Sequence, residues 1–225
     1  MQFDEYFEYF LEKFDQPTSQ LVATPEEIEE YRDVLPDRLL EYWGKIGFSG
    51  FKEGLFWITN PADYVDILDR FLDDTLFPDI DTYHVIARSA WGELYLWGEK
   101  TGASLEVSPY LNWITTAQDS KKEIKKGLAD KKIERFFAYT KIHDVDIEGE
   151  DDKPLFERTL KTLGPLTETE VYGFAPYLFM GGQKKLANIQ KLDLITHLNL
   201  IADMGDMEII DMAALVSQTM KEHGA

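Results

Sequence analysis

The side chains best suited to proton transfer or metal binding are four histidines, and they are scattered along the chain. They are His84, His143, His197 and His223. None stands in the HExxH spacing that places two metal ligands on one helical face. Cysteine is absent and no GxSxG nucleophile motif occurs, which excludes thiolate chemistry and the serine hydrolase pattern. We therefore expect no catalytic residue, no cofactor and no enzymatic activity, with each histidine structural or at the surface.

Two further segments look like ligand loops but lack an essential residue. Asp144, Asp146, Glu148 and Gly149 suggest a calcium loop, but the position that needs a bidentate glutamate holds Leu155. The stretch 181–185 offers glycines and lysines for phosphate, yet it lacks the Walker spacing and the Ser or Thr that follows the lysine. We expect no metal site, and we interpret the first segment as an acidic loop and the second as a turn.

Acidic residues dominate the chain, whose 42 acids and 23 bases give a net charge of −19. Residues 1–120 carry a net charge of −16, and residues 142–152 contain six acids and no lysine or arginine. The intervening residues 121–141 are basic, with a net charge of +5. An acidic surface repels nucleic acid and anionic lipid, and it attracts basic proteins. Simple solubility explains the charge equally well.

Acidic residues in two short segments are the candidates for contact with a basic partner. The first segment lies between a predicted helix and a predicted strand, and the second is the acidic loop. A solvated surface is the alternative for both, and also for the glutamates at 26–30, which suit a helix N-terminus. The candidate partner-binding residues are Asp73, Asp74, Asp79, Asp81, Asp144, Asp146, Glu148, Glu150, Asp151 and Asp152.

The elements of the first half predict helices followed by an antiparallel sheet. Apolar residues at three- and four-residue spacing predict a helix over 3–14. Thr24-Pro25 and Leu35-Pro36 begin two more helices, and Asn60-Pro61 begins another after a buried strand at 55–58. The runs 83–88, 93–97 and 104–107 then alternate as strands. We expect an α+β fold in which helices pack on a mostly antiparallel sheet, with two closely associated subdomains.

The composition changes near residues 116–130, and we place the domain boundary there, giving domains 1–118 and 119–225. In the second half we expect a lysine-rich helix after 120, a helix after Pro154 and a strand within 171–180. A long helix is expected over 189–201, and a further helix from Met207. Residues 136–139 fit either a strand or a helix. The N-terminal residues lack a secretory pattern and no run approaches about 20 apolar residues, so we expect a cytoplasmic protein without a membrane anchor.

Two strings of residues resemble known families. Leu35-Pro36 through Trp43 to Gly47, then 54–57 and 88–97, resemble the GAD-like domain, and the Leu-Pro…Trp…Gly portion is similar to SUKH-type immunity folds. Residues 170–176, Gly181-Gly182 and the helix through His197 are similar to the C-terminal domain of Tdi-type immunity proteins of type VI secretion systems. The resemblance implies an immunity protein that neutralises a cognate DNase effector toxin.

What the resemblance implies agrees with the charge, because a DNase must hold phosphates in a basic cleft. The expected partner is thus a basic nuclease effector, bound by protein contact, and we expect no direct binding to nucleic acid or membrane. The family transfers no catalytic residue to this chain. Two alternatives stay open: a SUKH-like regulatory module that binds another cellular protein, and a carboxylate-dependent hydrolase, which requires a pocket of converging acids with raised pKa values.

Overall fold

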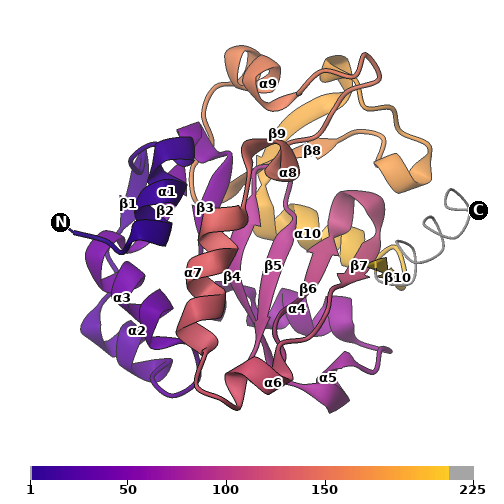
Figure 1. Ribbon diagram of the computed structural model, residues 1–225. Coiled ribbons are helices and arrows are strands. Elements are labelled where there is room, and N and C mark those ends of the chain that lie inside the picture. Colours follow the sequence, from indigo (N-terminus) through magenta and orange to yellow (C-terminus); the bar gives the residue numbers. More distant parts are fainter. Residues whose placement is uncertain (1, 213–225) are drawn as a thin grey trace, which may run out of the picture.

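A computed structural model describes residues 2–212 of the chain. The described residues form one large sheet, with strand order β1-β2-β3-β4-β5-β6-β7-β10, and a separate hairpin of β8 and β9 (Figure 1). The strands are β1 Ser19–Leu21, β2 Phe48–Phe51, β3 Phe56–Ile58, β4 Tyr83–Ser89, β5 Leu94–Gly98, β6 Gly102–Ser108, β7 Trp113–Thr116, β8 Glu170–Phe174, β9 Ile189–Asp193 and β10 Glu208–Asp211.

Helices lie on both faces of this sheet (Figure 1). They are α1 Glu5–Phe14, α2 Pro25–Glu30, α3 Asp37–Ile46, α4 Val65–Leu72, α5 Phe77–Ile80, α6 Lys121–Ile124, α7 Ala129–Tyr139, α8 Ile142–Val145, α9 Phe156–Leu163 and α10 Leu194–Ala202. Strands β1 to β7 pair antiparallel with their neighbours, and β10 pairs parallel with β7. The prediction of helices packed on a mostly antiparallel sheet is confirmed.

Local sequence signals set several element ends where we expected them. The Thr24 side chain accepts the amide of Glu27, and the Glu27 carboxylate accepts the amide of Thr24, so a capping box begins α2. Gly47 ends α3 with a φ of 66°, a left-handed value that favours glycine. The Asn60 side chain accepts the amide of Ala62 at the turn before α4.

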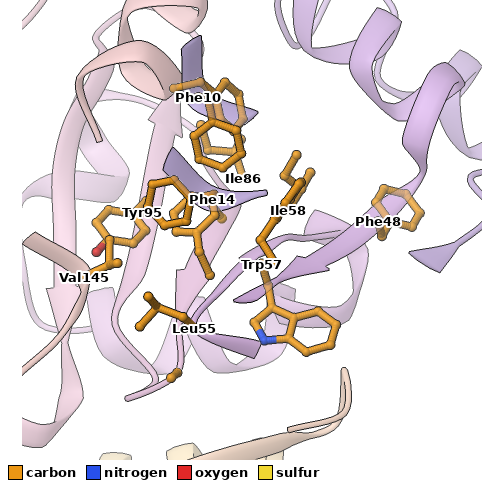
Figure 2. Close-up of a cluster of buried hydrophobic side chains, with 14 of the residues drawn as sticks. Phe10, Phe14, Phe48, Leu55, Trp57, Ile58, Ile86, Tyr95 and Val145 are labelled. Carbon is orange, nitrogen blue, oxygen red and sulfur yellow. The ribbon is translucent and has the colours of Figure 1, made fainter. Parts of the chain in front are cut away.

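One face of the sheet is covered by α1, α3 and α7 and has an aromatic core (Figure 2). The Phe10 ring lies 4.5 Å from the ring of Phe14 and 5.4 Å from that of Phe137, measured between centroids. Tyr95 comes from the sheet itself, and Val145 from α8 (Figure 2). These rings bury large apolar areas and prefer tilted or edge-on packing, which gives this face a well-defined interior.

The opposite face is covered by α4 and α10, and its core is mostly aliphatic. Ile67 and Leu68 from α4 meet Leu198 and Ile201 from α10 over the strand residues of the sheet. Since α4 belongs to the first half of the chain and α10 to the second, this core joins the two halves. Strand β10 joins them again, because it extends the sheet built by the first half.

Arg88 adds a polar link between the halves. Its guanidinium lies over the Trp57 ring at 4.7 Å, and its Nη2 donates to the backbone oxygen of Glu168 at 2.8 Å. The side chain is only 1% exposed, and burial lowers its pKa. A buried guanidinium needs such acceptors and a ring face, so β4 holds the segment before β8 in place.

Two predictions for the second half need correction. Residues 189–201 do not form one helix: β9 runs to Asp193, and the Asp193 carboxylate caps α10 by accepting the amide of Thr196. The apolar spacing suited a helix throughout, but pairing with β8 keeps 189–193 extended. Residues 208–211 form β10 rather than a helix, because β7 offers an open edge; the tail from 213 lies outside the described residues. The expected lysine-rich helix is present as α6, and residues 136–139, which fitted either a strand or a helix, belong to α7.

Candidate functional site

A small acidic hollow of about 240 Å³ lies where the end of α4 meets the segment after α10. We call it the α4–α10 acidic hollow. Its walls carry four carboxylates, those of Asp73, Asp74, Asp203 and Asp206. Arg70 is the one base among the residues that line it, and it donates to Asp203 at 2.5 Å. The hollow therefore keeps an excess of negative charge that a basic partner can neutralise.

Exposed apolar side chains lie in the same segments as these acids. Leu76 follows Asp74 and is 73% exposed, and Met204 follows Asp203 and is 46% exposed. On α10 itself, Leu200 is 49% exposed. A protein interface gains most of its affinity from apolar and aromatic anchors surrounded by a polar rim. The α4–α10 region supplies both kinds of residue.

Sequence reasoning found only half of this hollow. Asp73 and Asp74 were predicted as partner-binding residues, whereas Asp203, Asp206 and Arg70 were not. The pair from the second half is separated by more than a hundred residues from the first pair, and no local pattern connects them. The Asp-Met-Gly-Asp string at 203–206, directly after a helix, was the available signal of a second exposed acidic turn.

Two of the predicted residues are used inside the protein and do not present a free carboxylate. Asp81 is 4% exposed, and its carboxylate accepts the amides of Lys100 and Thr101 at 2.9 and 2.8 Å. Asp146 accepts the Trp91 indole N–H at 3.2 Å and the amide of Phe156 at 3.0 Å. Both carboxylates hold turns of the chain in place. The prediction that Asp81 and Asp146 face a partner is therefore wrong. Asp79 remains exposed on α5.

The rest of the acidic loop is exposed but more neutralised than the α4–α10 acidic hollow. Asp151 accepts Arg158 Nη1 at 3.0 Å, and Glu150 lies 3.2 Å from Lys185 Nζ. The other exposed acids of the loop are Asp144, Glu148 and Asp152. At α2, Glu27 serves the capping box and Glu29 pairs with Arg32 at 2.7 Å, as expected for a helix start.

Two comparisons with known protein families identify the halves of the chain. Residues 5–111 match the GAD-like domain, and residues 130–205 match the family described as T6SS immunity protein Tdi1, C-terminal. The chain is thus similar to a GAD-like domain over 5–111 and to a Tdi1-type immunity domain over 130–205. The α4–α10 acidic hollow takes Asp73 and Asp74 from the first matched stretch and Asp203 from the second.

A solved structure has the same fold as this chain. The crystal structure of Atu4351 from Agrobacterium tumefaciens superposes with a TM-score of 0.78 at 22% sequence identity, over 92% of each chain. At that identity the likeness concerns the fold alone. No curated protein matches the sequence.

A second hollow, of about 640 Å³, lies between the sheet and helices α7 and α8. Glu93, Glu106 and Asp144 line it together with the bases Lys132 and Arg135. Glu93 accepts the Ser108 hydroxyl at 2.6 Å and the Tyr95 hydroxyl at 2.9 Å, and burial raises its pKa. Desolvation, then the charge of Glu93, raises the pKa of Glu106 to about 7, although its side chain reaches solvent. This is the kind of pocket that the hydrolase alternative requires.

Metal and membrane sites find no support in the described chain. Across residues 2–212, no group of three or more histidine or carboxylate side chains is placed to hold a metal ion. Within the same residues, no helix combines the length and the apolar character needed to cross a bilayer.

Proposed function

We propose that this protein is a cytoplasmic immunity protein that binds and neutralises a cognate type VI secretion DNase effector. The Tdi1-type domain supports the immunity role. The single observation that carries the binding mode is the α4–α10 acidic hollow, in which carboxylates from both halves meet beside exposed apolar side chains. The proposed domains are residues 1–118 and 119–225, and the proposed contact surface spans both.

Charge explains why such a surface suits a nuclease. A DNase holds the phosphate backbone with basic side chains. Its positively charged cleft therefore complements the negatively charged hollow. Opposite potentials speed the encounter of two proteins, which matters for a protein that must reach an incoming toxin before the toxin reaches DNA. The same acidic surface disfavours direct binding of this protein to nucleic acid.

Charge alone does not give tight binding, because exposed ion pairs contribute little in water. The exposed Leu76, Leu200 and Met204 supply apolar area that a partner can bury at the margin of the acids. We therefore place the contact over the end of α4, the outer side of α10 and the turn after it. The remaining exposed acids of 144–152, together with Asp79, form a secondary proposal for contact.

Co-expression with the toxin encoded beside this gene tests the proposal directly. The protein is expected to co-purify with the toxin and to restore growth of cells that express it. The double variant Asp73→Lys with Asp206→Lys is expected neither to co-purify with the toxin nor to restore growth, since it reverses the charge of the hollow. Glu5→Lys with Glu12→Lys is the matched control, because it makes the same change in net charge at exposed positions of α1. If both double variants protect equally, the hollow is not the contact surface; a wild type that neither co-purifies nor protects refutes the function.

The hollow of Glu93 and Glu106 favours a second candidate, a carboxylate-dependent hydrolase that would inactivate the toxin or its product. The variant Glu106→Gln separates the two candidates, because it removes an ionisable carboxylate and keeps the shape of the side chain. If the protein neutralises the toxin by contact alone, the Glu106→Gln variant is expected to protect cells as well as the wild type does. A complete loss of protection with toxin binding retained would select the hydrolase.

A further inference from the structure

A mostly apolar hollow of about 320 Å³ lies on the outer side of α10, in the second half of the chain. Tyr177, Leu192 and Leu200 form much of its wall, together with Pro176. His197 also lines it and is the one histidine there. A hollow of this size is at the lower limit for a small-molecule site, and it suits a single large side chain of a protein partner.

His197 is buried without a hydrogen bond. The side chain is 3% exposed, and Nδ1 is buried with no partner. Its ring stacks loosely on the Tyr177 ring, with centroids 5.6 Å apart. Burial lowers its pKa to about 4, so at neutral pH the imidazole is uncharged and offers one donor and one acceptor.

The backbone makes room for this ring. A Cβ atom at Gly173 would lie 2.6 Å from Cε1 of His197, so residue 173 must be glycine for the imidazole to occupy its position. Burying a polar group that finds no hydrogen bond lowers stability. A phenylalanine or leucine at 197 would fill the space without that loss. The fold thus gains nothing from an imidazole here, which points to a use outside the fold.

The hollow lies close in sequence to the proposed contact surface. Leu200 on α10 lines this hollow, and Asp203, the residue that follows α10, lines the α4–α10 acidic hollow. Residues three apart across a helix end lie about one turn apart. A basic protein that docks on the acids can therefore reach this hollow.

We propose that the hollow receives a tyrosine side chain of the basic effector, whose ring packs between Pro176, Tyr177 and Leu200 and whose hydroxyl pairs with His197. The proposal rests on the proposed function, because it takes the effector as the partner. A phenol fits the observations since its ring matches the apolar wall and its hydroxyl both donates and accepts. Tyrosine is also among the residues that most often carry the binding energy of an interface.

The affinity of purified variants for the purified effector tests this, alongside their stability. Thr196→Trp places an indole at the mouth of the hollow and is expected to weaken binding about 100-fold, while Leu200→Ala weakens it about 10-fold. Exposed residues of the same types elsewhere give the controls Thr162→Trp, on α9, and Leu128→Ala, just before α7, and both are expected to bind like the wild type.

His197→Phe separates a binding role from a structural one. We expect it to unfold at the same or a higher temperature than the wild type, because an unpaired polar group is removed, and yet to bind the effector about 10-fold more weakly. Lower stability with unchanged affinity would overturn the proposal and make His197 a packing residue. Unchanged affinity in Thr196→Trp would overturn it as well.

A measurement without the effector keeps this proposal distinct from the proposed function. In NMR titrations, p-cresol is expected to shift the imidazole resonances of His197 in the wild type and not in Thr196→Trp, and toluene is expected to bind more weakly than p-cresol. Equal binding of both compounds, or of neither, contradicts a phenol site. If the wild type binds no effector at all, the proposed function fails, and the p-cresol result still decides the chemistry of the hollow.

Discussion

The two faces of the large sheet differ in how far the charged side chains of their covering helices are paired. On the face of α1, α3 and α7, bases reach across to acceptors of neighbouring elements: Lys13 Nζ donates to the backbone oxygen of Ala138 at 2.6 Å, and Arg38 lies 3.1 Å from the Glu134 carboxylate. On the face of α4 and α10, Arg70 also reaches across to Asp203, but it is the one base among the four carboxylates that line the α4–α10 acidic hollow. On the first face, charged side chains link neighbouring elements of the fold. On the second face, carboxylates stay exposed to solvent.

The cores beneath the two faces differ in the same way. The aromatic core is built from rings that pack on one another beneath α1 and α7. Above the aliphatic core, α10 borders hollows on its outer side and keeps Leu200 exposed. The aromatic face mainly supports the fold, and the α4–α10 face is the one that we propose for contact with a partner.

The largest effect on stability is expected in the aromatic core. Phe10→Ala removes a fully buried ring that touches Phe14, Phe51 and Phe137. The free energy of unfolding is expected to fall by about 3–5 kcal/mol in chemical denaturation. The folded fraction is expected to bind the effector with wild-type affinity, and a change in that affinity would contradict the division between the two faces.

The second effect concerns acid stability on the α4–α10 face. His197 has a pKa of about 4 when folded and 6.5 in the unfolded chain, so the unfolded state binds the proton first as the pH falls. The wild type is therefore expected to lose about 3 kcal/mol of stability between pH 6.5 and pH 4 that His197→Phe does not lose. Denaturation curves at several pH values measure this, and parallel pH profiles of the two proteins would show that His197 titrates normally.

The third effect is on the rate of association with the effector. For the wild type we expect this rate to fall steeply as salt is added, because salt screens the attraction of the hollow for a basic protein. Asp73→Lys with Asp206→Lys is expected to associate about 10-fold more slowly at low salt and to respond less to added salt. Stopped-flow mixing measures both, and Glu5→Lys with Glu12→Lys on the aromatic face serves for comparison.

The smallest effect is expected at Glu106, in the hollow beneath α7. Its pKa of about 7 in the folded state exceeds its ordinary value, so the folded state favours the protonated form. The ionised carboxylate thus lowers stability above pH 7, and this loss disappears as the pH falls toward the ordinary pKa of a glutamate. Glu106→Gln is expected to raise the unfolding temperature at pH 8 and to leave it unchanged at pH 4. An equal gain at both pH values would show that protonation is not the cause.

Local signals in the sequence determined the element ends and the antiparallel strands of the first half. The capping box at Thr24 and the glycine at 47 act through neighbouring backbone groups, so the residues alone specify them. The family resemblance could also be read from short strings, because it lies in glycines, prolines and aromatic residues that the fold requires at fixed places.

Only the tertiary structure decided which acids face a partner. Asp81 and Asp146 look like their exposed neighbours in sequence, but backbone amides brought in from other segments take up their carboxylates. Asp203 and Asp206 join the proposed contact surface because packing of α10 on α4 places them in one hollow with Asp73. The same packing leaves His197 buried without a partner. Contacts between residues far apart in the chain depend on the whole fold, and for that reason no local pattern could predict them.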